Sequence, residues 1–169
     1  GKVTSELSIP DKVLYSNADF ICKSADDYMT HLNKRCSSIN VDHHQKNIIG
    51  SQEKFTYTID ASWFVRSFAN DYNPVHFHPG CSLSSIGYLK LPDWQEELAK
   101  DKEDHFGLTH GCVQFVYGTG GRPFENHLYT IRPKVGDFYV FPSWLSHTVY
   151  PFKSLGERRS FSFNISVEV

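Results

Sequence analysis

The sequence predicts an all-β fold, either a sandwich or a barrel. From Phe55 onward the chain consists of short segments rich in β-branched and aromatic residues, and turn residues separate them at fairly even spacing. Only one segment of the chain has a convincing helical pattern. Many short strands combined with a single helix are typical of sandwiches and barrels.

The first elements precede this β region. Residues 12–15 are predicted to form a strand, and Ser24 is predicted to cap a helix that runs toward Arg35, because Asp26 and Asp27 follow it as early acidic residues. We expect this N-terminal helix to pack outside the β core against one face of a sheet. Residues 37–50 read as an exposed connection, in which the adjacent His43 and His44 are expected to be solvated.

The predicted core covers residues 55–169. Residues 92–106 are charged and lack a strand pattern, so we expect an insertion or lid there with one short helical stretch at 95–102. Residues 118–123 are predicted to form a turn. The predicted strands are residues 55–59, 63–68, 84–91, 111–117, 129–132, 138–141, 147–152 and 160–169.

Length and composition limit the classes of protein. A chain of 169 residues suits one domain covering residues 1–169, and a net charge of −2 without a basic stripe gives no reason to expect nucleic acid as a partner. No apolar run approaches a membrane span and no signal-peptide pattern is present, so we expect no membrane partner and a cytoplasmic location. Four widely spaced cysteines predict reduced structural thiols.

A pair of histidines separated by one residue is the first indication of a metal site. Side chains alternate along an extended chain, so His76 and His78 would point to the same face and could hold one ion together. His147 is expected to supply the third ligand after a short bend at residues 142–145. Imidazole suits Fe, Zn, Cu and Ni, and three ligands that leave open positions are the arrangement of non-haem iron oxygenases.

Strand alternation also singles out an arginine. In a strand that starts near Glu157, Arg158 shares one face with Ser160 and Ser162, and Arg159 lies on the other face with two phenylalanines. A polar face of this kind is expected to line the barrel interior. An arginine there needs an anionic partner, and a guanidinium group matches a carboxylate with two parallel hydrogen bonds. Pairing of Arg158 with an acidic surface side chain is the alternative, and Arg159 is the second candidate.

Several ordered elements together carry a resemblance to a known family. The chain between about Trp63 and Asn164 resembles the iron(II)- and 2-oxoglutarate-dependent dioxygenases, in particular the small bacterial and phage proteins similar to prolyl-4-hydroxylases. The elements are His76-Phe77-His78, Tyr88-Leu89, Pro133 with Gly136-Asp137 and Phe141, His147, and Arg158 with Ser160.

The resemblance implies a double-stranded β-helix, the cupin-like jelly roll, with the metal at its wider mouth. It implies Fe(II) and 2-oxoglutarate as cofactors, with Arg158 binding the distal carboxylate of 2-oxoglutarate beside the hydroxyl groups of Ser160 and Tyr88. O2 would be the second cosubstrate. The implied reaction is hydroxylation of an unidentified small-molecule or protein substrate, with release of succinate and CO2.

The chain departs from this family at one position. The family usually has HxD or HxE, whereas His78 stands here in place of the carboxylate. Three neutral imidazoles leave a divalent metal with its full charge, which alters the redox balance. The alternatives to a His78 ligand are a water in its place, or an inward turn of Asp71, whose ordinary role in a polar turn is capping.

Further residues are assigned to the surroundings of the site. Asn73, Arg66 and Trp144 are candidates for substrate contact or for support of the ligands, although Arg66 is equally well explained as a charge at the end of the barrel, and Trp144 as a packing or rim residue. The alternative function is a cupin-like metal-binding protein, or a three-His dioxygenase that does not use 2-oxoglutarate. A cupin usually has a Glu ligand shortly after its HxH, and residues 81–85 contain none.

Overall fold

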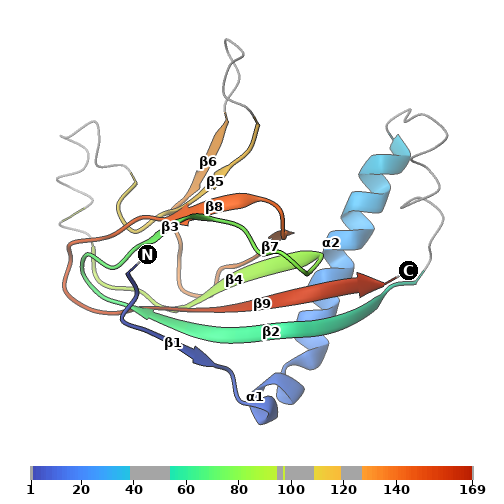
Figure 1. Ribbon diagram of the computed structural model, residues 1–169, viewed down its shortest axis with the longest axis horizontal. Helices are drawn as coiled ribbons and strands as arrows, with labels where there is room; N and C mark the ends of the chain where they lie inside the picture. Colours follow the sequence, from blue (N-terminus) through green and yellow to red (C-terminus); the bar gives the residue numbers. More distant parts are fainter. Residues whose placement is uncertain (1, 39–53, 95–96, 98–108, 119–126, 169) are drawn as a thin grey trace.

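Two antiparallel β-sheets that face each other form the frame of the protein (Figure 1). The computed structural model describes residues 2–38, 54–94, 97, 109–118 and 127–168. The large sheet has the strand order β1 (Ser5–Ser8), β2 (Thr56–Ser67), β9 (Arg158–Glu168), β4 (Leu83–Lys90) and β7 (Phe138–Pro142). The small sheet has the order β3 (Asn73–His76), β8 (Ser146–Val149), β5 (Val113–Val116) and β6 (Leu128–Ile131).

The order of these strands is that of a double-stranded β-helix. From β2 to β9 the chain passes back and forth between the sheets: β2, β4, β7 and β9 belong to the large sheet, and β3, β5, β6 and β8 belong to the small one. Apolar side chains of both sheets pack between them, with Val113, Phe115, Phe141 and Val149 buried in one cluster. The predicted fold class is therefore confirmed.

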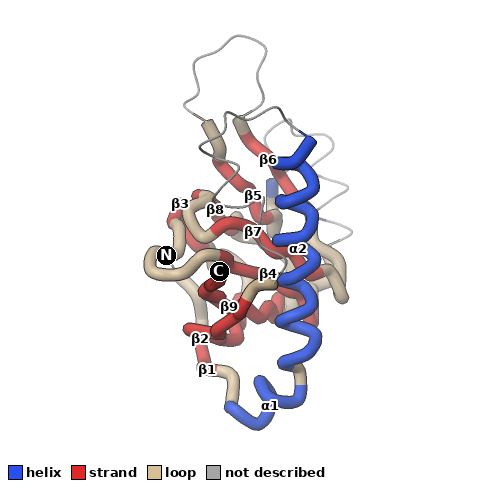
Figure 2. Tube along the Cα trace, turned by 90° about the vertical axis from the view of Figure 1, so that its right-hand side faces the viewer, coloured by secondary structure: helices blue, strands red, loops and turns tan. Residues whose placement is uncertain are grey.

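The N-terminal helix covers the outer face of the large sheet, as predicted. Helix α2 (Ala18–Ser38) runs along this sheet in Figure 2, and its buried Ile21 and Ala25 pack with Phe163 and Ile165 of β9. The helix starts before Ser24. The Ser24 hydroxyl donates a hydrogen bond to the Phe20 carbonyl oxygen inside the helix, so Ser24 is not the predicted cap.

The predicted strand at residues 12–15 is wrong, because this segment forms the short helix α1 (Asp11–Ser16). An apolar run of this length does not distinguish a strand from a helical turn by its pattern. Here Pro10 fixes the helix start, and the side chains of Ser16 and Asn17 donate hydrogen bonds to the carbonyl oxygens of the first turn. Residues 5–8, for which no strand is predicted, form β1, which pairs with β2 as the edge strand of the large sheet.

The remaining predicted strands agree with the structure apart from their ends. The two strands predicted at 55–59 and 63–68 form one continuous strand, β2, with a register irregularity between Ile59 and Ala61. At the centre of the large sheet, Gly87 of β4 lies against the ring of Phe161 in β9, so that a Cβ atom at Gly87 would collide with it.

Some expectations lie outside the described residues. They are the solvated His43 and His44, the short helical stretch at 95–102 apart from Glu97, and most of the turn at 118–123. Cys22 and Cys81 are free thiols. Within the described ranges, neither helix combines the length and the apolar character needed to cross a membrane.

Candidate metal centre

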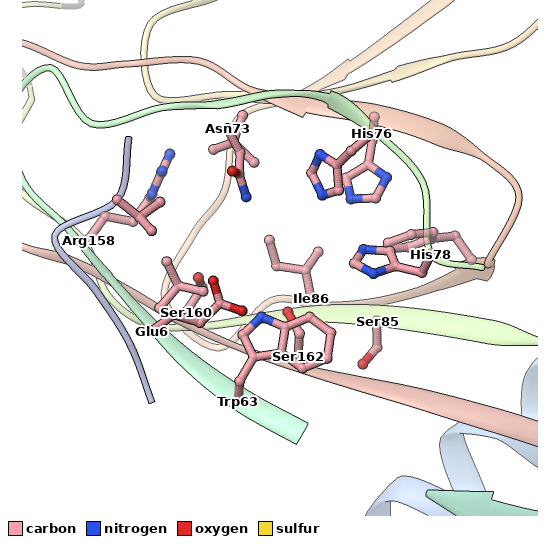
Figure 3. Close-up of a pocket in the computed structure, with 15 residues that line it drawn as sticks. Glu6, Trp63, Asn73, His76, His78, Ser85, Ile86, Arg158, Ser160 and Ser162 are labelled. Atoms are coloured by element: carbon pink, nitrogen blue, oxygen red, sulfur yellow. The ribbon is translucent and has the colours of Figure 1, made fainter. Parts of the chain in front are cut away.

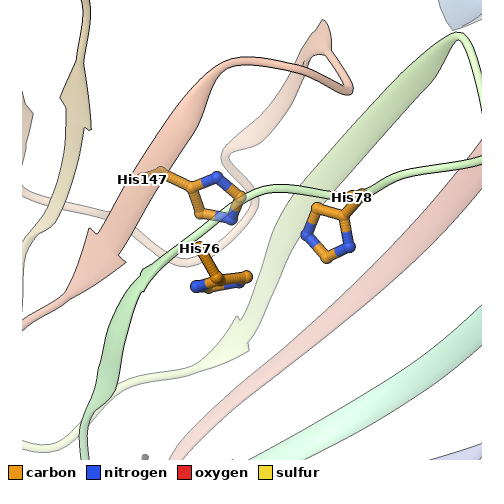
Figure 4. Close-up of side chains that lie close together, drawn as sticks. All are labelled: His76, His78 and His147. Carbon is orange, nitrogen blue, oxygen red and sulfur yellow. The ribbon is translucent and has the colours of Figure 1, made fainter.

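Three histidine side chains from two distant segments of the chain lie together (Figure 4). One ring nitrogen of each of His76, His78 and His147 lies within 4.8 Å of the corresponding nitrogens of the other two. The ring centroid of His76 is 4.3 Å from that of His147 and 5.2 Å from that of His78. Such a cluster is compact enough for all three rings to contact a single ion.

The register of the small sheet explains this arrangement. His76 ends β3 and lies directly opposite His147 of β8, so the two side chains project from neighbouring positions of one sheet. His78 follows two residues later, just beyond the strand, where its backbone N–H donates a hydrogen bond of 3.0 Å to the Ser143 carbonyl oxygen. This bond keeps the chain extended, and His78 therefore remains on the face of His76.

Backbone carbonyl groups orient two of the three rings. His76 Nδ1 lies 2.7 Å from the Pro74 carbonyl oxygen, and His147 Nδ1 lies 3.0 Å from the Leu145 carbonyl oxygen. A carbonyl oxygen only accepts hydrogen bonds, so each Nδ1 carries the proton and each Nε2 keeps a free lone pair. Metal-binding histidines are commonly oriented through their second nitrogen in this way.

The environment keeps two of the imidazoles neutral. Burial, opposed by the hydrogen bond to Leu145 and assisted by the two neighbouring histidines, lowers the pKa of His147 to about 4. Burial, followed by the nearby His76, also lowers the pKa of His78. At neutral pH these rings therefore present lone pairs instead of positive charges.

The cluster forms part of a cavity of about 270 Å³ between the two sheets (Figure 3). His76 and His78 lie on one side of it, and Arg158 lies at the other end in the view of Figure 3. Ser160 and Ser162 line the wall that β9 provides. The polar face that strand alternation predicts for β9 is thus the face that lines the cavity, while Arg159 on the opposite face pairs with Glu157.

Arg158 is deeply buried and has no acidic partner within 4 Å among the described residues. It is 3% exposed, and its guanidinium group donates to the Ser67 hydroxyl at 3.3 Å and to the carbonyl oxygens of Gly111 and Tyr150 at 3.5 Å. These bonds are long, and none of them neutralises the charge. Burial lowers the pKa of Arg158, which reflects the cost of holding a cation there without a counter-charge. The surface-pair alternative for Arg158 is wrong.

Tyr88 has an unsatisfied hydroxyl group close to this arginine. It is 1% exposed, lies opposite Ser160 in the β4–β9 register, and its hydroxyl finds no hydrogen-bond partner among the described residues. Burial raises the pKa of Tyr88 and the nearby Arg158 opposes this shift, so the phenol keeps its proton at neutral pH. Tyr88 is not among the residues that line the cavity. A buried hydroxyl without a partner is costly, and a ligand beside Arg158 is one way to satisfy it.

Of the residues assigned to the surroundings, the structure brings only one to the cavity. Asn73 lines it. Arg66 instead forms an ion pair with Glu157, its Nε atom 2.6 Å from the carboxylate, and its guanidinium group lies over the ring of Phe68. Trp144 is 69% exposed and does not line the cavity.

Asp71 does not join the histidines. Its buried carboxylate accepts hydrogen bonds from the Thr4 hydroxyl at 2.6 Å and from the Phe68 N–H at 3.0 Å. Although burial opposes it, these bonds lower the pKa of Asp71. Asp71 therefore fixes the turn and the N-terminal segment, which is the capping role expected of it.

Sequence reasoning missed the contribution of the N-terminal segment to the site. Val3 and Glu6 line the cavity, Glu6 from strand β1, and Trp63 lines it from β2. Residues 5–8 carry no strong strand pattern, and pairing of an edge strand across more than 50 residues of sequence is not a local property. The alternation of Trp63 with Val65 along β2 was the available signal for the inward face of Trp63.

The strand that carries Arg158 is anchored by an ion-pair cluster around Glu157. The nearly buried Glu157 carboxylate contacts Arg66, Arg159 and, at 3.5 Å, Lys90. Hydrogen bonds from Arg159 and then from Arg66 lower the pKa of Glu157 to about 2. Because the folded-state pKa lies below the ordinary value, this stabilisation is fully present above about pH 4.5 and is lost as the pH falls toward 2.

We therefore expect Glu157→Gln to lower the free energy of unfolding at pH 7 by about 1 to 2 kcal/mol, allowing for solvent screening of the half-exposed cations. The difference from the wild type should shrink as the pH is lowered from about 4.5 to 2. Denaturant unfolding of both proteins across this pH range measures the difference in the free energy of unfolding. Asp27→Asn, which removes an exposed pair on α2, is the matched control. A difference that is constant with pH would show that the pairing of Glu157 is not its cause.

Residues 61–164 match the model of a family described as putative 2OG-Fe(II) oxygenase. A search of curated proteins gives no match.

Solved structures with a similar fold include three described as oxygenases or hydroxylases. An oxidoreductase of the 2OG-Fe(II) oxygenase family from Burkholderia pseudomallei is 17% identical, with 70% of this chain and 48% of that chain covered and a TM-score of 0.49. A prolyl-4-hydroxylase from Pseudomonas putida is 18% identical, with 83% and 61% covered and a TM-score of 0.44. A viral collagen prolyl hydroxylase from Paramecium Bursaria Chlorella virus-1, as a 2OG complex, is 16% identical, with 87% and 70% covered and a TM-score of 0.46. The chain thus spans less than two thirds of the length of the first two structures.

Proposed function

Since the chain belongs to the putative 2OG-Fe(II) oxygenase family, we propose that it is an iron(II)- and 2-oxoglutarate-dependent oxygenase that hydroxylates a substrate with release of succinate and CO2. The observation that carries this proposal is the combination, in one cavity, of three clustered imidazoles and a buried arginine without a counter-charge. A cofactor that ligates a metal at one end and offers a carboxylate at the other satisfies both features.

The donor set fits a divalent transition metal. His76, His78 and His147 would hold it, because imidazole nitrogen is a good ligand for Fe(II), and two of the rings are already oriented by carbonyl groups. Phe115 and Phe141 pack against the His147 ring, with centroids 5.9 and 5.0 Å away. These rings restrict the movement of the ligand and exclude water from one side of the centre. A three-His set discriminates little between metals of the same charge, so Zn, Ni or Co are expected to bind as well.

The other end of the cavity fits the distal carboxylate of 2-oxoglutarate. Arg158 offers a buried guanidinium group, and Ser160 and Tyr88 add hydroxyl groups, of which that of Tyr88 has no partner. A carboxylate bound here would pair with Arg158 and accept the bidentate hydrogen bonds for which a guanidinium group is shaped. The stabilisation of the buried cation is thus coupled to binding of the cosubstrate.

When bound, iron and 2-oxoglutarate supply the oxidising chemistry: O2 is consumed, 2-oxoglutarate is decarboxylated to succinate and CO2, and one oxygen atom enters a C–H bond of the substrate. The residues of this chain bind and orient the reactants. Ile86, Phe141 and Val149 are among the apolar residues of the cavity wall and limit the access of water.

The third histidine changes the charge of the centre. Three neutral imidazoles leave a divalent ion with charge +2, and dianionic 2-oxoglutarate would bring the complex to zero. With a carboxylate in place of His78, the same complex would carry −1. The extra positive charge is expected to strengthen binding of the anionic cosubstrate and to raise the reduction potential of the metal.

The proposal is tested by anaerobic titration of the Fe(II)-loaded protein with 2-oxoglutarate, followed by exposure to O2. Chelation of iron by the keto acid should produce a visible metal-to-ligand charge-transfer band, and O2 should then release succinate. No band and no succinate would contradict the oxygenase and favour the cupin-like metal-binding protein. A band without succinate would support the cosubstrate site while contradicting turnover in the absence of the prime substrate.

A further inference from the structure

The edge strand β1 brings one carboxylate to the cavity. Glu6 lies opposite Val65 in the β1–β2 register, and Trp63 is two positions further along β2 on the same face. Figure 3 shows Glu6 and Trp63 together on the wall of the large sheet, with Asn73 and His76 across the cavity from them. Glu6 is the only acidic side chain among the described residues that line this cavity.

The Glu6 carboxylate has no partner inside the described part of the protein. It accepts no hydrogen bond there, and no lysine, arginine or histidine nitrogen lies within 4 Å of it. Arg158, the other charged residue of the cavity wall, is held by Ser67, Gly111 and Tyr150 instead. Glu6 is exposed, so its carboxylate is accessible to a ligand that enters from the open side.

Trp63 adds a second feature that favours a cation. Its indole is half-buried, lines the cavity, and lies beside His78 with ring centroids 5.7 Å apart. The face of a tryptophan ring attracts ammonium and guanidinium groups, and this attraction grows as water is excluded. A carboxylate and an indole on adjacent strands, next to the histidine cluster, form a recognisable subsite for a cationic group.

The separation of charges in the filled cavity supports the same assignment. The distal carboxylate of 2-oxoglutarate would pair with Arg158 and its keto acid end would lie at the metal, so neither positive charge would contact Glu6 on β1. A cationic group of the substrate beside Glu6 would be attracted, whereas an anionic group there would be repelled.

We propose that Glu6 and Trp63 form the subsite that selects the substrate, and that this substrate carries an ammonium or guanidinium group, as a lysine or arginine side chain does. This inference rests on the proposed function for the identity of the reaction, but the subsite itself requires only the cavity. Glu6 sets the charge preference, and Trp63 provides the surface on which the cationic group and its alkyl chain lie.

The test compares probes that differ only in side-chain charge. Nα-acetyl-arginine methylamide is compared with its neutral citrulline analogue, and Nα-acetyl-lysine methylamide with its norleucine analogue. Binding is measured by calorimetry on the protein loaded with Zn(II) and 2-oxoglutarate, and again on the protein alone. At least one cationic probe should bind about tenfold more tightly than its neutral analogue, and this ratio should fall at high salt.

Three variants assign the preference to the two residues. Glu6→Gln should reduce the ratio to about one, and Glu6→Lys should reverse the preference toward Nα-acetyl-glutamate methylamide. Trp63→Leu, which keeps an apolar side chain, should weaken binding of the cationic probe. Glu168→Gln, the same change at an exposed position at the end of β9, should leave the ratio unchanged.

Several results would overturn the subsite. Equal binding of charged and neutral probes, a preference that survives Glu6→Gln, or no binding of either cationic probe at millimolar concentration would each do so. These outcomes are separate from failure of the proposed function, which is decided by the charge-transfer band and succinate release. A protein that lacks the band but discriminates the probes through Glu6 would contradict the oxygenase and keep the subsite.

Discussion

Replacing His147 with alanine is expected to abolish stoichiometric binding of Fe(II). His147 is the most buried of the three clustered histidines, it lies directly opposite His76, and its Nδ1 is already occupied by the Leu145 carbonyl oxygen. Removing it leaves two ligands, one of which lies beyond the end of its strand. Metal content after anaerobic loading and desalting, checked by calorimetry with Ni(II), measures the effect.

Two further variants separate loss of a ligand from loss of the fold. His31→Ala removes an exposed imidazole on α2 and should leave the metal content at one ion per chain. His78→Asp replaces one ligand type by another, giving the usual set of two histidines and one carboxylate, and should retain the metal. A His147→Ala protein that is folded by circular dichroism yet still binds one equivalent would show that His147 is not a ligand. Loss of all metal in a folded His78→Asp protein would remove His78 from the centre.

The parts of this site that the sequence predicts are those governed by strand alternation. The spacing of His76 and His78, and that of Arg158, Ser160 and Ser162, place each set on one face whatever the neighbouring strands are. The structure has both sets on the cavity wall. Alternation requires only that the segment be extended, and His78 shows that even the residues just beyond a strand can follow it.

The parts that could not be predicted depend on which strands become neighbours. Arg66 alternates with Phe64 and Phe68, which leaves its inward or outward direction open until the register of β2 with β9 places it beside Arg159 and Glu157. The pairing of β1 with β2 is likewise a contact between distant segments. That pairing places Glu6 in the cavity wall. The sequence alone does not predict this position, because no local pattern distinguishes a single glutamate in a polar N-terminal segment.

The prediction of a strand at residues 12–15, where the structure has helix α1, failed for a different reason. Four residues with three hydrophobic side chains fit one helical turn as well as a short strand, so the neighbouring residues determine which of the two forms. Pro10 has an extended conformation at the start, and Asn17 closes the end by donating from its side chain to the Val13 carbonyl oxygen. Local capping therefore overrides the β propensity of Val13 and Tyr15.

Replacing Arg158 with alanine is expected to weaken binding of 2-oxoglutarate by about 2 to 5 kcal/mol, which is about 30-fold to several thousandfold in the dissociation constant. The loss is large because the distal carboxylate would enter a buried site from which the guanidinium group has been removed, and the hydroxyl groups of Ser160 and Tyr88 are neutral. Anaerobic titration of the Fe(II)-loaded variant, followed through the charge-transfer band, gives the dissociation constant. Arg158→Lys keeps the positive charge but lacks the planar guanidinium group, so its affinity for 2-oxoglutarate should lie between those of the wild type and Arg158→Ala.

Two controls decide whether the effect comes from the proposed contact. Arg159→Ala removes a guanidinium group from the opposite face of the same strand, where it pairs with Glu157, and should leave 2-oxoglutarate binding unchanged. Pyruvate carries the same keto acid group as 2-oxoglutarate but no distal carboxylate, so its binding should be the same in the wild type and in Arg158→Ala. If pyruvate binding weakens as much as 2-oxoglutarate binding, Arg158 supports the metal centre through the fold. If neither weakens, the carboxylate is held elsewhere, and the unpaired charge of Arg158 needs another ligand.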